Sequence, residues 1–360
     1  MTDDEQGAFG FSGSWREFAP IAFTNIALTI VTLGIYRFWA TARTRRYLWS
    51  RTRFIDEPLE WTGTGLELFI GFLLVLVLFG IPFLFLQFGA QALLLRGHTG
   101  IAVILSFIAS AIIFYLSGVA RFRALRYRLS RTFWHGIRGG ADDNGFGYGF
   151  SFMWKYAVGY LTAGLLIPWA MMSLWNERWR EMSFGPLAFR SSGSAADVFL
   201  RFLLFYLAPF LIVIALGIVG FSMLPLFAGL DLEGGQAPRG PVMAGIFLGL
   251  IAIYGVLGLV ALVYYAKFLR VAIGGLSLGE IDFHFTARSK HWVLLILGDI
   301  ALVVLTLGIG LAFLGYRHWS FFIRHLSASG EISLSAFTQS TTRAPGQGEG
   351  LLDAFDVGAI

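Results

Sequence analysis

Four long apolar stretches stand out from the pattern of hydrophobic and polar positions, and none of them contains Asp, Glu, Lys or Arg. They are Leu68–Leu95, Gly97–Ala120, Phe202–Leu230 and Gly240–Ala266. Each is longer than the roughly 20 residues that an α-helix needs to cross a hydrocarbon core of about 30 Å. Short polar turns join them in two pairs, so the pattern predicts two membrane-spanning helical hairpins.

Three other apolar stretches are shorter or are interrupted by a polar residue. They are Phe18–Tyr36, Tyr156–Asn176 and Trp292–Tyr316. Aligned without gaps, they share a Thr-x-Gly triplet whose threonine and glycine are Thr32 and Gly34, Thr162 and Gly164, and Thr306 and Gly308. A glycine tolerates the positive φ of a sharp reversal, and such an alignment is typical of an internal repeat. We therefore predict three copies of one unit, each with a helix break at its triplet.

The basic residues discriminate between two topologies, because Lys and Arg near helix ends tend to stay in the cytoplasm. If the three units dip into the membrane and return, only Arg96 and Arg239 of the 27 Lys and Arg face outward. Seven spanning helices would also place Arg178 and Lys267 outside. We predict an all-α integral membrane protein with four spanning helices in two hairpins and three re-entrant or interfacial units; the alternative has seven spanning helices.

This prediction divides the chain into seven segments and places both termini in the cytoplasm. The segments are an N-terminal segment (1–17), unit 1 with a basic segment (18–66), hairpin 1 (67–120), a basic segment with unit 2 (121–197), hairpin 2 (198–266), unit 3 (267–326) and a flexible tail (327–360). The tail ends in a short acidic stretch, Asp353–Asp356, that could dock on a basic surface.

The composition excludes a soluble enzyme. Of the 360 residues, 56% are hydrophobic and 14% charged, whereas a soluble domain has about 25% charged residues. The chain has no cysteine, which excludes disulfides and thiolate metal sites. It also has no nucleotide-binding, metalloprotease or nucleophile-elbow motif. We therefore expect no catalytic residue, no metal and no cofactor.

Arginine and aromatic residues alternate where the apolar stretches end. Candidates for contact with lipid headgroups are Arg43, Arg45, Arg46, Tyr47, Arg121, Arg123, Arg126, Arg128, Lys267 and Arg270. Each basic residue near a membrane surface attracts anionic lipid by about 1 kcal/mol. The pattern indicates membrane lipids, including anionic ones, as partners and gives no reason to expect nucleic acid; a homo-oligomer is possible without specific support. Topology alone would also explain these residues.

One polar residue stands seven positions before the threonine of each triplet: Asn25, Lys155 and Asp299. A carboxylate inside a membrane is costly unless it is paired, so Asp299 is a candidate functional residue. Lys155 is its obvious partner by sign. In the alternative, Lys155 extends to the interface and Asp299 accepts hydrogen bonds from the backbone of its own unit.

These motifs also resemble a known family. Phe11-Ser12-Gly13, Asn25, the run Thr32–Trp39, Arg45–Leu48 and the closing Asp353–Asp356 are similar to the YjgN-like family of bacterial inner-membrane proteins, domain of unknown function 898. The resemblance implies a bacterial inner-membrane location and no particular activity.

The sequence favours a non-enzymatic membrane protein that binds or organises lipid. The alternative is a small-solute transporter or channel whose path is lined by the broken units, at Asn25, Thr32, Asp299 and Thr306. A membrane-embedded enzyme ranks third, because no nucleophile or acid–base pair converges in the pattern.

Overall fold

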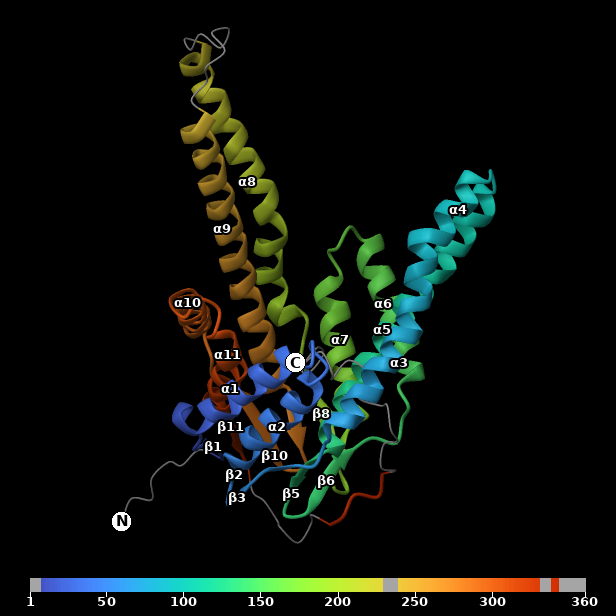
Figure 1. The fold of residues 1–360 in the computed structure, drawn as a ribbon, viewed down its shortest axis with the longest axis vertical. Helices are drawn as coiled ribbons and strands as arrows, with labels where there is room; N and C mark the ends of the chain where they lie inside the picture. Colours follow the sequence, from blue (N-terminus) through green and yellow to red (C-terminus); the bar gives the residue numbers. More distant parts are fainter. Residues whose placement is uncertain (1–7, 229–238, 331–337, 343–360) are drawn as a thin grey trace.

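The computed structural model describes residues 8–228, 239–330 and 338–342. Within this part of the chain, four helical segments are long and apolar enough to cross a membrane. The first is α3 (Gly65–Leu84), which continues through a π-helical turn, η1 (Phe85–Gly89), into α4 (Ala90–Leu95). The others are α5 (Thr99–Ser130), α8 (Ala196–Ala228) and α9 (Arg239–Gly274). The two predicted apolar hairpins are present, with helices long and apolar enough to span a membrane, and Figure 1 shows them diverging from a common base.

The other six helices form three short hairpins, one for each predicted unit. Unit 1 contains α1 (Trp15–Val31) and α2 (Arg37–Ser50), unit 2 contains α6 (Phe146–Leu161) and α7 (Ile167–Arg180), and unit 3 contains α10 (Ser289–Leu305) and α11 (Leu311–His325). Each helix has 14 to 17 residues, which is short of the length needed to span. The alternative of seven spanning helices is therefore not supported.

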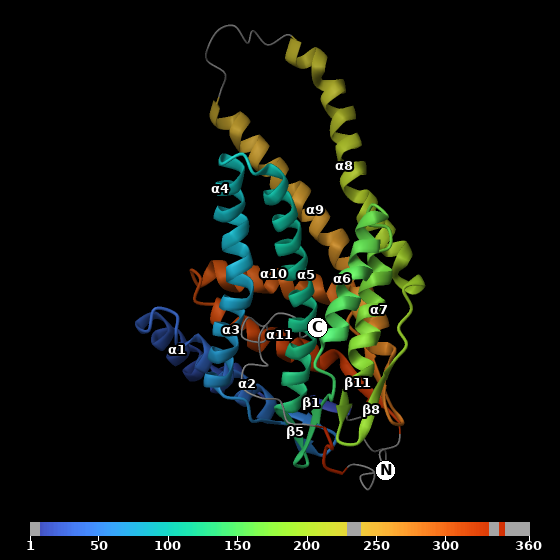
Figure 2. The ribbon, with the colours of Figure 1, turned by 90° about the vertical axis from the view of Figure 1, so that its right-hand side faces the viewer.

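The three units differ in their orientation to the spanning helices. In both ribbon views α6 and α7 run alongside the spanning helices, between the two long hairpins. Helix α10 of unit 3 instead lies across the long axis: it is seen end-on in Figure 1 and lengthwise in Figure 2. Unit 2 therefore fills the space between the long hairpins near the base, whereas α10 extends sideways.

A curved antiparallel sheet closes the base of the molecule, so the all-α prediction is wrong in this respect. Eight strands follow in chain order: β4 (Glu60–Trp61), β5 (Thr132–Trp134), β6 (Ile137–Gly140), β7 (Ser183–Phe184), β8 (Leu187–Ser191), β9 (Leu276–Leu278), β10 (Ile281–Phe285) and β11 (Leu326–Ser329). A three-stranded sheet holds β1 (Phe9–Phe11), β2 (Thr52–Phe54) and β3 (Glu57–Pro58). Strands of two to five residues are too short to give a distinct period in the sequence.

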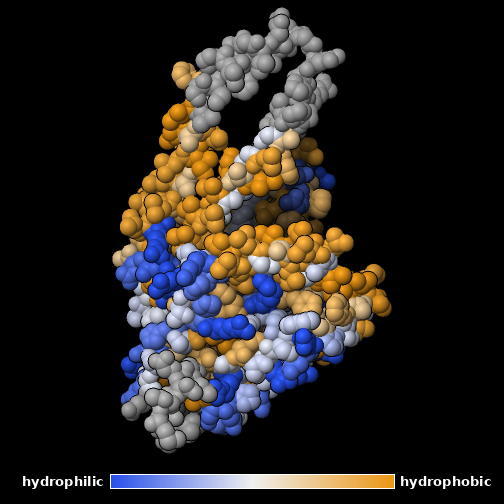
Figure 3. Space-filling view, turned by 90° about the vertical axis from the view of Figure 1, so that its left-hand side faces the viewer, coloured by the Kyte–Doolittle hydropathy of each residue, from blue (hydrophilic) through white to orange (hydrophobic). Residues whose placement is uncertain are grey.

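An aromatic core joins this sheet to the helix ends above it. Trp134, Phe189 and Phe283 from the strands pack in one buried cluster with Phe122 of α5 and Phe268 of α9. Figure 3 shows the resulting division of the surface: polar residues gather at the sheet end, and apolar residues cover the helices above. Such a division is typical of a membrane protein whose apolar helices lie in lipid.

Candidate functional site

The three hairpin tips have the same local structure. In each, the threonine hydroxyl donates to the carbonyl four residues earlier and accepts from the backbone N–H four residues later. The N–H to Oγ1 distances are 2.9 Å (Tyr36 to Thr32), 3.2 Å (Leu166 to Thr162) and 2.7 Å (Gly310 to Thr306). The hydroxyl thus links the last turn of the first helix to the backbone N–H of the residue that precedes the second helix, and it supplies an acceptor for that N–H. All six predicted break residues lie at these tips.

The glycine of each triplet has a φ of 92–94°, and the residue before it also has a positive φ. That residue is Leu33, Ala163 or Leu307, with φ between 50 and 53°. A positive φ is unfavourable for leucine. Leu33 is nevertheless 94% exposed and Leu307 93% exposed. Each of these leucines therefore combines an unfavourable backbone conformation with an apolar side chain exposed at the end of its hairpin.

Asn25, Lys155 and Asp299 are buried, and each binds the second helix of its own unit. Asn25 Nδ2 donates to the Ala40 carbonyl and to Thr44 Oγ1, both at 3.3 Å. Lys155 forms an ion pair with Glu177. The hypothesis that Lys155 pairs with Asp299 is therefore wrong, because each side chain has a partner across its own hairpin. Lys155 also does not extend to the interface as in the alternative, because it is buried.

Asp299 holds unit 3 together by side-chain contacts rather than by the backbone contacts of the alternative prediction. Arg317 Nε donates to Asp299 Oδ1 at 2.7 Å, and His318 Nε2 lies 2.6 Å from Oδ2. The ungapped alignment contained a signal for this arrangement, because Arg317 lies 18 residues after Asp299 just as Arg43 follows Asn25. The shared polar position is therefore a clamp between the two helices of a hairpin.

The predicted headgroup arginines fall into two groups. Arg43 and Arg46 lie on the exposed face of α2, and Lys267 and Arg270 are partly exposed at the end of α9. Arg45 and Arg126, in contrast, are only 5% and 3% exposed. The second group therefore lies inside the protein rather than on a lipid-facing surface.

The arginines at the end of α5 mainly hold the start of unit 2. Arg126 donates to the Asp143 carbonyl at 3.0 Å, and Arg123 donates to the Asn144 carbonyl at 3.0 Å. The Arg121 guanidinium lies 4.7 Å from the centre of the Phe152 ring on α6. These contacts order the segment that leads into α6, so these three side chains have a structural role.

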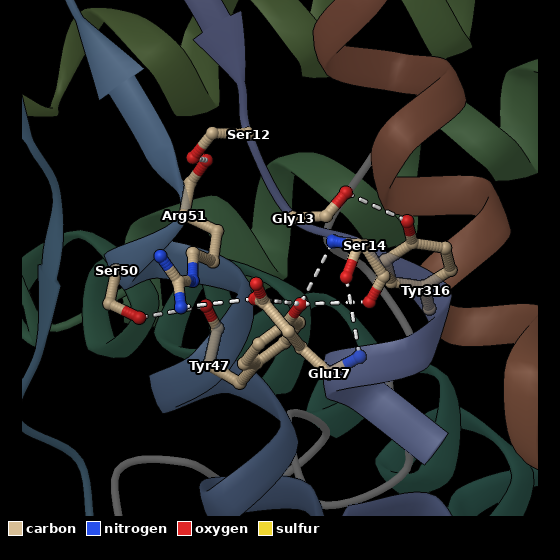
Figure 4. A network of polar contacts seen from close by, with 8 residues as sticks. All are labelled: Ser12, Gly13, Ser14, Glu17, Tyr47, Ser50, Arg51 and Tyr316. Atoms are coloured by element: carbon tan, nitrogen blue, oxygen red, sulfur yellow. Dashed lines mark hydrogen bonds and ion pairs between the residues drawn. The ribbon is translucent and has the colours of Figure 1, made fainter.

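Tyr47 belongs to a polar network that joins units 1 and 3 (Figure 4). Its hydroxyl donates to the Ser14 carbonyl at 3.0 Å and accepts from the Ser14 N–H at 3.1 Å. Beside it, Glu17 pairs with Arg51, and the Tyr316 hydroxyl of α11 donates to the Gly13 carbonyl at 2.9 Å. Burial raises the pKa of Tyr47 above its usual value, so the hydroxyl stays neutral and can donate.

Units 1 and 3 and the sheet enclose a cavity of about 1070 Å³. Pockets of about 300–1,000 Å³ already hold most of a drug-sized ligand, so this space can accept a larger molecule. Most of the lining is apolar and comes from α1, α11 and the inner face of the sheet, including Phe18, Phe322, Phe189 and Phe283.

One end of the cavity lies toward the hairpin tips, and the other is buried against the inner face of the sheet. Ile30 and Leu311, which line it near the tips of units 1 and 3, are 69% and 61% exposed. Trp175 and Phe189, which line it near the sheet, are buried. The cavity therefore extends from the apolar surface of the molecule into its core.

Helix α2 supplies more of the polar lining of the cavity than any other helix. Arg37, Thr41, Thr44, Arg45 and Leu48 all line it, with the spacing of one helix face. This spacing is readable in the sequence, but the pattern alone does not say whether the face meets lipid, water or a cavity. The prediction of Arg45 as a surface residue is therefore wrong, and Thr41 and Thr44 are not among the residues that the sequence pattern singles out.

The described residues contain no group of three His, Asp or Glu side chains placed to hold a metal ion. His291 and His325, which come from the two helices of unit 3, have ring centres 4.9 Å apart. His291 Nδ1 accepts from the Arg288 N–H, and His325 Nδ1 lies 2.8 Å from the Phe321 carbonyl. Local hydrogen bonds thus use one ring nitrogen of each histidine.

Comparison with known proteins agrees with the resemblance in the sequence. Residues 6–354 match the family described as bacterial protein of unknown function (DUF898). Inner membrane protein YjgN of Salmonella typhimurium is 28% identical over 138 residues, which cover 38% of this chain and 32% of that protein. The Escherichia coli K12 protein of the same name is 33% identical over 63 residues, covering 18% and 16%.

The aligned regions thus span a third or less of these curated relatives. No solved structure matches the chain. The family match covers both spanning hairpins and all three units. The chain therefore belongs to the DUF898 family of bacterial proteins, as the resemblance in its sequence implies.

Proposed function

We propose that this chain is a bacterial inner-membrane protein that binds membrane lipid in its central cavity and catalyses no reaction. The observation that carries the proposal is the cavity itself, which is large and mainly apolar. Burial of apolar ligand surface in such a space is favourable by about 25 cal/mol per Å². The relatives named as inner membrane proteins and the four apolar spans support the location.

In this proposal the sheet lies in the cytoplasm. The chain enters and leaves both spanning hairpins at the sheet end, so residues 8–64, 131–195 and 275–330 share one side. The basic clusters lie at that end, and Arg96 lies in the turn between α4 and α5 at the opposite end. The excess of Lys and Arg on the sheet side supports this orientation.

The short hairpins contact the inner leaflet in two ways. The upright unit 2 dips part of the way into the bilayer beside α5, whereas α10 lies in the interface. Leu33 and Leu307 insert among acyl chains, which offsets the unfavourable backbone at these positions. Because the tips of units 1 and 3 flank the outer end of the cavity, a lipid can reach it sideways from the leaflet.

The contacts of the polar residues favour lipid binding over solute transport. Asn25, Lys155 and Asp299 each bind a partner within their own hairpin. They therefore do not form a common polar path across the molecule. A solute pathway needs such a path, whereas an acyl-chain site needs an apolar one.

The proposal is tested by filling the cavity from α11. Gly315 and Ala312 both line it, and a Cβ added at Gly315 would meet no atom within 4 Å. In the variant Ala312→Phe/Gly315→Leu, native mass spectrometry of the purified protein should show less than half of the wild-type bound lipid. The thermal midpoint should hold, because the added side chains enter open space.

The matched control is Gly147→Leu/Ala157→Phe on α6. A Cβ added at Gly147 also meets nothing within 4 Å, and neither residue lines the cavity. Bound lipid should stay at the wild-type level in this control. Equal lipid in the two variants and the wild type would show that the lipid lies elsewhere and would refute the proposed function.

A further inference from the structure

A second cavity, here named the unit 2 cavity, has a volume of about 520 Å³ and lies beside helix α7. It follows one face of this helix from Trp169, near the hairpin tip, to Arg180 at the sheet end. Lys155 of α6 also lines it, as do Gly193 and Ala195, which precede α8. None of the described residues lines both this cavity and the central one, so the unit 2 cavity is a separate site.

Hydrogen bonds fix the walls of the unit 2 cavity. Asn176 Nδ2 donates to the Gly193 carbonyl at 2.8 Å, and Asn176 Oδ1 accepts from the Gly193 N–H at 3.1 Å and from the Ser191 hydroxyl at 2.8 Å. Arg180 Nε donates to the Ser191 carbonyl at 2.8 Å. The segment that leads into α8 is thus held against α7, and the cavity is formed before any ligand enters, as binding sites usually are.

The charged lining of the unit 2 cavity carries both signs. Lys155 forms an ion pair with Glu177, so these two charges offset each other. Arg180 is the last residue of α7, and Glu181 is its C-cap. Consecutive residues of a helix do not face each other, and neither of these two forms an ion pair with a described residue. A ligand here would therefore meet one cationic and one anionic group that do not neutralise each other.

Apolar surface lies directly beside this polar lining. The start of α8 runs alongside α7 (Figures 1 and 2), up to Tyr206, whose hydroxyl donates to the Ala163 carbonyl of the tip at 2.9 Å. Leu200 and Leu204 on this stretch of α8 are exposed. The ring of Trp169 packs against Trp154 of α6 near the tip. Charged groups beside exposed apolar residues, with tryptophan between them, are typical of the membrane interface.

We infer that the unit 2 cavity binds the headgroup of a lipid that carries both a phosphate and a primary ammonium, as phosphatidylethanolamine does. The Arg180 guanidinium binds the phosphate oxygens, which match its planar fork of donors. The Glu181 carboxylate accepts from the ammonium, and the acyl chains lie along the exposed apolar residues of α8. This site is independent of the function proposed for the central cavity.

Other ligands match the cavity only in part. The quaternary ammonium of phosphatidylcholine has no N–H to donate to Glu181, and phosphatidylglycerol has no cation. The expected order of binding is therefore phosphatidylethanolamine before either of these lipids, at equal chain length. Free phosphoethanolamine presents the same two charged groups as the lipid, but only the lipid brings acyl chains that cover the apolar residues of α8.

The test measures the headgroup preference. Purified protein in detergent is incubated with equal amounts of the three lipids, all with identical chains, and bound species are counted by native mass spectrometry. The wild type should prefer phosphatidylethanolamine by about threefold. Glu181→Gln, an exposed position, should lose this preference and turn toward phosphatidylglycerol, because the remaining arginine favours an anion. Arg180→Gln should weaken all three lipids, since each carries a phosphate.

The matched controls are Glu280→Gln and Arg190→Gln. Both residues are exposed at the sheet end, and neither lines the unit 2 cavity. Both controls should keep the order of the wild type. Lipid in the central cavity adds the same background to all proteins, because none of the four substituted residues lines it.

The outcomes are distinct. A wild type without preference for phosphatidylethanolamine, or a control that loses this preference as Glu181→Gln does, overturns the inference and leaves the proposed function of the central cavity intact. Displacement of the bound lipid by millimolar phosphoethanolamine identifies the cavity as a site for a soluble zwitterion. Lipid that phosphoethanolamine does not displace identifies a site for the membrane lipid itself.

Discussion

The Thr-x-Gly tips allow one substitution to be compared at three equivalent places. Replacing the threonine by valine keeps the shape of the side chain and removes its hydroxyl. In unit 3 the hydroxyl of Thr306 donates to the Leu302 carbonyl at 2.6 Å and accepts from the Gly310 N–H at 2.7 Å. Thr306→Val therefore leaves the partly buried N–H of Gly310 without this acceptor.

The expected cost follows from this loss. An intramolecular hydrogen bond contributes about 1 kcal/mol net, and a buried donor left unsatisfied costs about 1–3 kcal/mol. We expect Thr306→Val to lower the free energy of unfolding by about 2 kcal/mol and Thr32→Val by slightly less. Thr162→Val should cost about 1 kcal/mol, since the Leu166 N–H is exposed and lies 3.2 Å from the hydroxyl.

The measurement is chemical unfolding in detergent micelles, followed by tryptophan fluorescence. The control is Thr24→Val on α1, an exposed residue whose hydroxyl donates only to the Pro20 carbonyl. This variant should stay within about 0.5 kcal/mol of the wild type. If Thr306→Val cost no more than Thr24→Val, or if Thr162→Val cost the most, the hydroxyl would not be what stabilises the tips.

Three further predictions concern packing, pH and topology. Gly118→Ala should destabilise the packing of α6 on α5 by about 1–3 kcal/mol, because the added Cβ would lie 2.6 Å from the Phe152 side chain. The control Gly100→Ala lies on the same helix, and its Cβ would meet open space. Thermal unfolding should therefore show a loss of stability in the first variant and none in the second. A hydrogen bond from His135 lowers the pKa of Asp56. This contact therefore stabilises the fold above the usual aspartate pKa, and the stabilisation is lost as the pH falls through the lowered pKa. In His135→Gln, NMR titration should find the pKa of Asp56 raised toward its usual value, and an unchanged titration would contradict this cause. A cysteine introduced at residue 290 should resist a periplasmic thiol reagent in intact cells and react after lysis, and labelling in intact cells would reverse the proposed orientation.

The buried polar residues Asn25, Lys155 and Asp299 show how much of the structure the alignment of the three units predicts. The alignment of the three units identifies the shared polar position of each first helix, but it does not predict that this residue binds the second helix of its own hairpin. It does not identify the partner, because Lys155 binds a residue 22 positions later, whereas Asp299 binds residues 18 and 19 positions later. One helix turn separates these choices, and the packing around each hairpin selects between them.

By itself, the sequence determined the parts of this protein that depend on local chain properties. An uncharged run longer than 20 residues has few stable environments other than a membrane, and a Thr-x-Gly triplet ends a helix through contacts within five residues. The tertiary structure decided the sheet, the burial of Arg45 and the cavity. Strand β4 pairs with β5 about 70 residues away, and the guanidinium of the buried Arg45 lies over the Trp61 ring, which itself packs against Tyr127 of α5. Such features depend on segments that meet only in the folded chain, so no local pattern specifies them.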